Sequence, residues 1–301
     1  MNMETAAVCR RNQLGKTGFF RRADGSLNTR KLGQWIVNLV ALGVAIIYLL
    51  PFTWMISTSL RPLDESYRMP PSYFPTSFDL SGYRMILNSD FPFFQCFLNS
   101  IVVTLSVTLC QFVTCTMAAF SFSRLEYPGK NALFGMLLAS LMVPIQVTMI
   151  PMFIMMSKLH LVDTLWSIIL PYCTSVFGIF LLRQSFMAIP KAIEDSAKID
   201  GAGYVRLFVQ IMLPQVKPAL ASMAIICING TWNNYFAPLV FISKWEKMTL
   251  PLGMVTLKGY MANGSLATIM AGVTLAALPI FILFICCQKN FVEGLAAYGV
   301  K

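Results

Sequence analysis

Charge is what this sequence has least of. Only 12% of its 301 residues are charged, 56% are hydrophobic, and the mean hydropathy is +0.66. Soluble domains carry about 25% charged residues, so this composition excludes an ordinary soluble protein. Asp, Glu, Lys and Arg are absent from six windows: 32–60, 91–123, 131–157, 164–182, 218–243 and 259–288. Each window is long enough for a spanning helix of about 20 residues. We therefore expect an all-α membrane protein with six transmembrane helices.

Groups that other classes of protein require are scarce as well. The single histidine, His160, has only Asp163 nearby, whereas an embedded enzyme needs an acid and base pair or metal ligands. The eight cysteines include no CxxC pair, and we expect neither a disulfide framework nor a metal site. A proton- or sodium-coupled transporter would carry ionisable residues at mid-membrane, and the six windows have none. We expect neither an enzyme nor a self-powered transporter.

Positive charge is unevenly placed along the chain. The first window is too long for the apolar region of a signal peptide, which has about 7–15 residues, so we expect an uncleaved first helix. With the N-terminus inside, the inner segments hold 16 of the 23 Lys and Arg residues and the outer segments hold 7. This bias predicts a multi-pass protein of the bacterial cell membrane, with membrane lipid as a partner and both termini in the cytoplasm. The basic tail lacks a groove lined by stacking aromatics, and we expect no nucleic-acid partner.

Two regions divide the chain. We expect a polar cytoplasmic tail over 1–31 and a six-helix transmembrane domain over 32–301. Gly15-Lys16-Thr17 in the tail is not a phosphate-binding loop, because Arg10 stands where that motif needs a glycine. The outer segment 61–90 contains Pro70, Pro71 and Pro75, and we expect no regular helix there.

Prolines also lie well inside the apolar windows: Pro51, Pro144, Pro151, Pro171, Pro238 and Pro279. Each removes a backbone donor and tends to kink its helix. Kinked helices around a transport cavity and kinks that only help helices to pack are both open interpretations.

The charged segment EDSAKIDGAGYVRLFVQIMLP lies on the predicted cytoplasmic side. Pro190 favours a helix start and Gly201 a helix end, and Pro214 closes a second helix. In that second helix, the spacing predicts an apolar stripe of Val205, Phe208, Val209 and Met212. Helices this short need a surface on which to pack. The bilayer surface is one candidate, but three acids among the five basic residues of this loop favour a protein partner.

The same segment resembles the EAA loop of ABC importer permeases. That pattern is E-A-A, three residues, Gly, nine residues and I-x-L-P, and here the matching groups are Asp195-Ser196-Ala197, Gly201 and Ile211-Met212-Leu213-Pro214. Asp195 replaces the usual Glu, and Ser196 replaces the first Ala. A glutamate, Glu194, stands one residue earlier. Either Glu194 or Asp195 could therefore supply the acid that pairs with the ATPase.

Further motifs extend the resemblance to the carbohydrate-uptake branch, over about Pro51 to Lys301. They are IDGAG at 199–203, LPQVKPAL at 213–220, NSIVVTL at 99–105, TWNNYFAPLVF at 231–241, TLPLG at 249–253, AGVTLAALP at 271–279 and QKNFVEGL at 288–295. The chain is most similar to the smaller, six-span permease of maltose-type importers. Tyr298-Gly299 replaces two small residues that are usual near the C-terminus, which makes a contact of the tail with the ATPase less secure.

The resemblance implies a type I importer permease fold and an ATP-driven importer of sugars, with an oligosaccharide expected. The implied partners are a second, different permease, two ATPase subunits that bind ATP and Mg²⁺, and an extracytoplasmic sugar-binding protein. No cofactor is expected on this chain. The loop at about 185–214 would dock on the ATPase through a set of nine residues: Glu194, Asp195, Ser196, Ala197, Asp200, Gly201, Phe208, Leu213 and Pro214.

Polar and aromatic residues gather in the outer half of the fifth window. Candidates for contacts with substrate are Asn229, Trp232, Asn233, Asn234 and Tyr235. Polar groups are costly in hydrocarbon unless they face protein or water, so they could line a sugar pathway or bond to neighbouring helices. An importer for another solute, such as glycerol phosphate or a polyamine, is the alternative. An Arg or acidic cluster in the pathway would favour it, and the fifth window has neither.

Overall fold

The computed structural model describes residues 29–62, 65, 73–88, 91–260 and 265–299. The expectations for residues 1–28, for Pro70 and Pro71 and for Lys301 therefore lie outside the described residues. The chain divides into two units, one up to Ser57 and one from Thr58 onward. The second unit contains every site discussed below.

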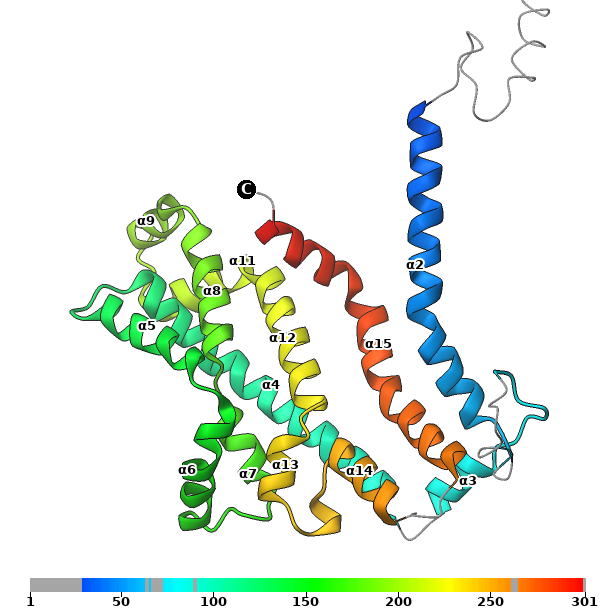
Figure 1. The fold of residues 1–301 in the computed structure, drawn as a ribbon. Coiled ribbons are helices and arrows are strands. Elements are labelled where there is room, and N and C mark those ends of the chain that lie inside the picture. The colour runs from blue at the N-terminus through cyan, green and yellow to red at the C-terminus, as the bar shows by residue number, and fades with distance from the viewer. Residues whose placement is uncertain (1–28, 63–64, 66–72, 89–90, 261–264, 300–301) are drawn as a thin grey trace, which may run out of the picture. The chain divides into compact units, whose positions relative to one another are not determined.

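The described part of the chain is helical throughout and contains no strand (Figure 1). Four helical stretches in it are long and apolar enough to cross a membrane: Gly33–Ser59, Phe93–Arg124, Trp166–Ala188 and Leu266–Cys287. Two further pairs of helices pass the same test together but are sharply bent, and the number is six if each bent pair is one span. The all-α membrane fold expected from the charge-free windows is confirmed.

The helices are, in chain order, α2 (Thr29–Ser59), α3 (Ser81–Asn88), α4 (Phe93–Arg124), α5 (Lys130–Ala139), η2 (Ser140–Met142), α6 (Ile145–Lys158), α7 (Trp166–Ile169), η3 (Leu170–Tyr172), α8 (Val176–Ala188), α9 (Lys191–Ile199), α10 (Tyr204–Arg206), η4 (Leu207–Met212), α11 (Leu213–Gln215), α12 (Lys217–Trp232), α13 (Phe236–Phe241), η5 (Trp245–Lys247), α14 (Leu250–Tyr260) and α15 (Leu266–Gly299). Helix α4 packs along α8 and α12, and α12 packs on α15. In Figure 1, α5 and α9 lie at one end of α4, and α7, α13 and α14 lie at the other.

Prolines break two of the apolar windows. The third window bends by 103° between Lys130–Met142 and Ile145–Lys158. Pro144 causes this bend, because a proline disfavours helical backbone in the residue before it, and Val143 is extended with ψ of 118°. In the fifth window α12 ends at Trp232, since a continuous helix would drive the ring of Pro238 into the carbonyl of Asn234.

The segment 61–90 contains a regular helix, contrary to the prediction. Helix α3 forms over Ser81–Asn88 because the last proline of this segment, Pro75, lies before it. Asp79 begins the helix by accepting hydrogen bonds from the amide and the hydroxyl of Ser81, each 2.8 Å long. These bonds lower the pKa of Asp79. Gly82 then packs closely on the backbone of Ala267 in α15.

Polar side chains hold the connections near the N-terminal end of α4 in place. Asn99 donates from its amide to the carbonyls of Glu246 and Met248, at 2.8 and 2.9 Å, and Ser100 accepts the amide of Leu250 at 2.7 Å. These contacts give a physical role to the first two residues of NSIVVTL. They tie the start of α4 to the segment that leads into α14.

A second clamp involves Asp163, in the turn between α6 and α7. Its backbone has φ of +65°, and its carboxylate accepts the amides of Ser243 and Lys244, both at 2.9 Å. The bond from Lys244 lowers the pKa of Asp163 most, and the bond from Ser243 lowers it further. This carboxylate therefore orders the connection between α13 and η5.

Candidate functional site

The charged loop folds into two short helical elements around a glycine. Helix α9 (Lys191–Ile199) follows Pro190 directly and ends at Asp200. The amide of Gly201 then bonds to the carbonyl of Lys198 at 3.0 Å, and that of Ala202 to Ala197 at 2.9 Å. This is a Schellman ending, which needs a residue in the left-handed conformation, and Gly201 has φ of +77°. The predicted glycine break is confirmed.

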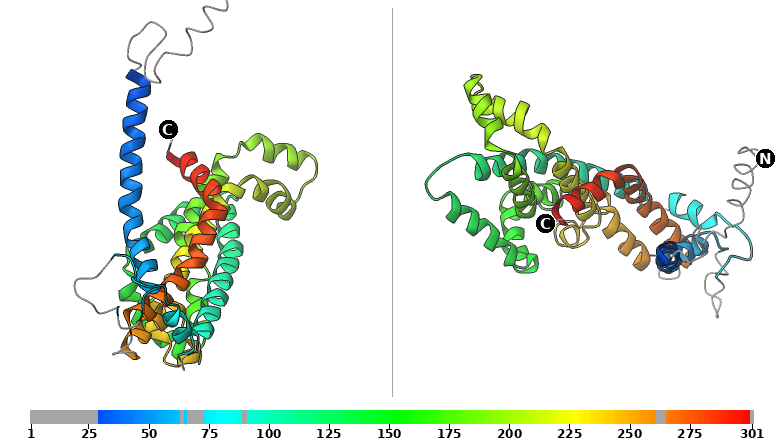
Figure 2. Two further views of the ribbon diagram at one scale, coloured as in Figure 1. Left: turned by 90° about the vertical axis from the view of Figure 1, so that its right-hand side faces the viewer. Right: turned by 90° about the horizontal axis from the view of Figure 1, so that it is seen from above.

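The second element runs from Tyr204 to Gln215 and contains a π-helical turn, η4 (Leu207–Met212). The views in Figure 2 show α9 and this element standing out from the bundle as a pair. Of the predicted stripe, Met212 is buried and Phe208 is half-buried, whereas Val205 and Val209 are exposed. Leu207, which flanks the stripe, is also buried, five positions before Met212. A π turn has more residues than an α turn, so it moves the inward face by about one position.

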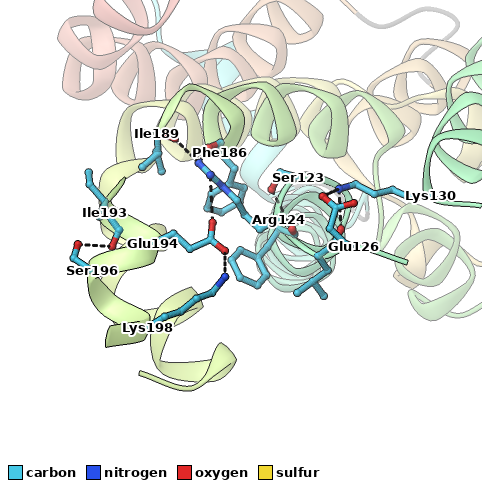
Figure 3. A network of polar contacts seen from close by, with 12 residues as sticks. Ser123, Arg124, Glu126, Lys130, Phe186, Ile189, Ile193, Glu194, Ser196 and Lys198 are labelled. Carbon is cyan, nitrogen blue, oxygen red and sulfur yellow. Dashed lines mark hydrogen bonds and ion pairs between the residues drawn. The ribbon is translucent and has the colours of Figure 1, made fainter. Parts of the chain in front are cut away.

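A buried ion pair joins α9 to the end of α4. Arg124 lies 3.4 Å from the carboxylate of Glu194, and their side chains are only 5% and 10% exposed. Arg124 also donates to the carbonyls of Phe186 and Ile189, where α8 ends (Figure 3). The carbonyls at the end of a helix have no partner within it, so the guanidinium satisfies groups of α8 and the charge of α9 together. Lys198 binds the second carboxylate oxygen at 2.8 Å, and this hydrogen bond raises the pKa of Lys198.

An aromatic cluster forms the second anchor of the loop. The ring of Phe208 lies 5.0 Å from that of Phe120 on α4 and 6.5 Å from that of Phe186 on α8, measured between centroids. Ala197 and Leu207 pack into the same buried cluster. Both helical elements of the loop are therefore fixed to the C-terminal ends of α4 and α8.

The nine residues predicted to dock on an ATPase divide into two groups. Glu194 and Ala197 are buried, and Phe208 and Leu213 are half-buried, so all four face the protein's own core. The exposed residues of the set are Asp195, Ser196, Asp200, Gly201 and Pro214. The hydroxyl of Ser196 is bonded to the carbonyl of Ala192 at 2.7 Å.

Exposed apolar side chains flank the two exposed acids, Asp195 and Asp200. Ile199 is 86% exposed, Val205 is 78% exposed and Tyr204 is exposed as well. We call Asp195, Ile199, Asp200, Tyr204 and Val205 the coupling face. The sequence interpretation did not single out Ile199 and Tyr204, and it included Val205 only as part of the apolar stripe. The sequence does hold a clue to these residues, because large apolar side chains stand on both sides of the Gly201 break without following a helical repeat.

The five candidates of the fifth window point in different directions. Trp232 is buried, donates to the carbonyl of Ala276 at 3.2 Å and packs edge-on against Phe97. Asn233 is exposed, and its amide group donates to the backbone and side-chain oxygens of Asn229, at 2.9 and 3.0 Å. Tyr235 packs, half-buried, against the outer core. The structure therefore does not bring these residues together in one lining.

Asn234 alone of the five lines a cavity of about 240 Å³ among α4, α8 and α12. Its side-chain oxygen also accepts the amide of Ala237 at the start of α13, at 3.2 Å. The polar neighbours in this lining are Gln111, Tyr172, Ser175 and Thr231, and none of the lining residues carries a charge. Gln111, buried and bonded to the carbonyl of Tyr172 at 2.9 Å, was missed in the sequence. An amide in the middle of a charge-free window was the signal.

Asn229 faces a different hollow. This space, of about 510 Å³, lies between α12 and α15 and is lined mainly by apolar residues, among them Ile225, Ile280 and Phe284. The amides of the fifth window are thus distributed over two sides of α12.

Comparison with known proteins agrees with this geometry. The family described as "Binding-protein-dependent transport system inner membrane component" matches residues 111–296. The arabinooligosaccharides transport system permease protein AraQ of Bacillus subtilis (strain 168) is 31% identical over 267 residues, 88% of this chain and 95% of the relative. The sn-glycerol-3-phosphate transport system permease protein UgpE of Escherichia coli O1:K1 / APEC is 29% identical over 267 residues, 86% and 94% of the two chains.

A solved structure has the same fold. A chain in the crystal structure of a bacterial ABC transporter involved in the import of the acidic polysaccharide alginate superposes with a TM-score of 0.76 and 25% identity, over 91% of this chain and 100% of that one. A chain in the alginate transporter structure in complex with an alginate pentasaccharide-bound periplasmic protein gives a TM-score of 0.61 at 14% identity, over 87% and 97%. The chain belongs to the family of binding-protein-dependent inner-membrane transport components, and is a multi-pass permease subunit of an ABC importer rather than an enzyme.

Proposed function

We propose that this chain forms one half of the membrane pathway of an ATP-driven importer for an oligosaccharide. A second, different permease supplies the other half, two ATPase subunits bind ATP and Mg²⁺, and an extracytoplasmic binding protein delivers the sugar. Both termini and the coupling face lie in the cytoplasm. The observation that carries the proposal is the charged loop itself, which exposes apolar side chains beside two acids while its inner side is anchored to α4 and α8.

Docking on an ATPase follows from the exposed side of the loop. Large apolar side chains that are exposed beside polar groups favour a protein partner, because burying them removes apolar area from water. Ile199, Tyr204 and Val205 supply that area. Of the two candidate acids, Asp195 is exposed, whereas Glu194 is already paired with Arg124 and Lys198. Asp195 is therefore the acid that we assign to a cation of the ATPase.

Transmission of force follows from the inner side of the loop. When the ATPase subunits close, they displace the coupling face. The Arg124–Glu194 pair and the contacts of Phe208 with Phe120 and Phe186 pass this displacement to α4 and α8. A helix bundle with two packings can be switched by such differential contacts.

The uncharged cavity beside Asn234 favours a neutral substrate. Amide and hydroxyl groups such as those of Gln111, Thr231 and Asn234 match sugar hydroxyls, and the ring of Tyr172 matches an apolar sugar face. A phosphate ester would need a cation to offset its charge, and this lining offers none. The names of two similar proteins nevertheless specify different solutes, an arabinooligosaccharide and sn-glycerol 3-phosphate, so glycerol phosphate is the alternative.

Reconstitution tests this function. The chain is purified with its co-expressed ATPase, second permease and binding protein, placed in liposomes, and given ATP inside and labelled solute outside. We expect ATP-dependent uptake of an oligosaccharide that sn-glycerol 3-phosphate does not compete away. Uptake of sn-glycerol 3-phosphate alone would favour the alternative, and uptake by this chain without ATP would refute the proposal.

A further inference from the structure

A polar cavity of about 490 Å³ lies beside the C-terminal end of α4. Its walls come from the end of α4, the turn that leads into α5, and the stretch from Arg183 on α8 to Lys191 on α9. Four cationic side chains line it, Arg124, Lys130, Arg183 and Lys191, against one acid, Glu126. The transport mechanism uses only Arg124 among them.

Two of these cations, Arg183 and Lys191, remain in excess once the acids are counted. Glu194 compensates Arg124, and Glu126 is 87% exposed and lies 3.5 Å from Lys130. Arg183 is held in place from one side only, since its Nε donates to the carbonyl of Phe122 at 3.0 Å and its guanidinium lies 4.1 Å over the ring of Phe134. Within the described residues, no hydrogen bond uses its two terminal nitrogens. A guanidinium fixed by its Nε and its face offers those nitrogens to a bidentate anion.

Backbone groups add to the positive potential. Gly129 precedes α5 with φ of +80°, and no side chain caps this helix. Gly129, Lys130, Asn131 and Ala132 all line the cavity. The amides of the first helical turn have no partner within the helix, and with the helix dipole they favour an anion.

Three of these cations lie directly at the ends of apolar windows, which indicates the depth of the cavity in the membrane. Arg124 is the first charge after the window 91–123, Lys130 is the last before 131–157, and Arg183 is the first after 164–182. Three apolar spans therefore end at this cavity. In a membrane this is the level of the lipid headgroups, where anionic lipids attract basic residues.

We propose that this cavity binds the phosphate of an anionic phospholipid from the inner leaflet. Arg183 and Lys191 contact the phosphate oxygens directly, and the first turn of α5 faces them from the opposite wall. A phosphate ester from a soluble compound shares this chemistry. The depth of the cavity favours the lipid.

Lipid retention by the intact importer tests the proposal. The complex is equilibrated in nanodiscs that contain equal phosphatidylglycerol and phosphatidylcholine, released into mild detergent, and analysed by native mass spectrometry. We expect phosphatidylglycerol to be retained preferentially, and retention to fall about fivefold for each charge removed in Arg183→Gln and Lys191→Gln. Arg183→Lys keeps the charge but loses the fixed bidentate fork, so it should retain more phosphatidylglycerol than Arg183→Gln and less than wild type. Lys217→Gln, an exposed cytoplasmic lysine outside the cavity, should keep all of it.

Two further arms separate the possible occupants. Inorganic phosphate is added to the lipid-free complex, and its binding is followed by ³¹P NMR. Binding at low millimolar concentration, lost in Arg183→Gln, would keep the anion site but overturn the lipid assignment. Equal phosphatidylglycerol retention by wild type and both Gln variants would overturn the site. Loss of the ATPase subunit from those variants with unchanged lipid would show that the cavity belongs to a protein interface and would also overturn the proposal.

Discussion

Glu194 faces inward to Arg124 at 3.4 Å, while its neighbour Asp195 faces outward. Two adjacent acids in one helix thus have different tasks. Glu194 fixes α9 to the ends of α4 and α8, and Asp195 remains available to a partner. Because only Asp195 is exposed, we assign the proposed pairing with an ATPase to Asp195 rather than to Glu194.

Removal of the buried carboxylate should destabilise the permease strongly. In Glu194→Ala, Arg124 remains buried without a counter-charge, which costs about 3–5 kcal/mol in comparable pairs. Thermal unfolding of the purified complex in detergent measures the loss. The double variant Arg124→Met with Glu194→Met should recover part of the stability, since no buried charge is left although the carbonyls of Phe186 and Ile189 lose their donor. A Glu194→Ala protein as stable as wild type would show that the pair does not anchor the loop.

Removal of the exposed acid should leave stability unchanged and weaken binding of the ATPase. Asp195→Ala takes away no buried contact, so the melting temperature should stay within a degree or so of wild type. The ATPase should co-purify in smaller amount and release sooner, because one charged contact is lost. Quantitative co-purification from equal amounts of membrane checks this. If Asp195→Ala unfolded readily and held its ATPase normally, the assignment of the two acids would be reversed.

Any side chain at position 201 should destabilise the loop. A non-glycine residue at φ of +77° costs about 1–2 kcal/mol, so Gly201→Ala should weaken the turn between the two helical elements. Gly201→Pro should abolish uptake while the protein remains in the membrane, because proline cannot adopt this φ and cannot donate to Lys198. Gly203→Ala is the matched control, since Gly203 has φ of −69° and open space around it. ATP-driven uptake in proteoliposomes distinguishes the three variants.

The Asp163 clamp should make the outer connections sensitive to acid. The pKa of Asp163 is lowered in the folded state, so its contribution is complete above the ordinary carboxyl pKa of about 3.9 and is lost as pH falls through the lower folded value. Asp163→Asn keeps the left-handed backbone but removes the charge. Its melting temperature should lie below that of wild type at neutral pH, and the difference should shrink as the pH falls below the ordinary carboxyl pKa. A difference independent of pH would contradict a role for the ionised carboxylate.

Two adjacent asparagines should differ in transport. Asn234 lines the uncharged cavity, whereas the amide group of Asn233 is bonded to Asn229. We expect Asn234→Ala to raise the apparent KM for sugar uptake several-fold, at about 1 kcal/mol for one lost hydrogen bond. Asn233→Ala should leave KM unchanged. The reverse result would place the pathway on the other side of α12.

Much of the fold could be predicted because charge is excluded from hydrocarbon. The windows located the apolar helices, Pro144 explained a sharp bend, and Gly201 marked the end of α9. The loop motif pointed to the region that carries the coupling face. These features depend on local sequence, where the chemistry of one or a few residues decides the conformation.

The parts that sequence did not give depend on tertiary contacts. The inward face of the second coupling element could not be read from a 3.6-residue period, because η4 is a π turn that buries Leu207 and Met212. The role of Glu194 depends on Arg124, which lies 70 positions earlier in the chain. Helix α3 forms in a segment whose prolines end before it.

Photo-crosslinking from Val205 tests the central claim most directly. A benzophenone amino acid at this exposed position of the coupling face is activated in the intact importer, with the same probe at exposed Val255 on α14 as the control at the other end of the bundle. We predict an adduct between position 205 and the ATPase subunit, altered in yield by ATP, and none from position 255. Adducts of position 205 with lipid alone, or with the extracytoplasmic binding protein, would contradict the proposed coupling of this loop to an ATPase.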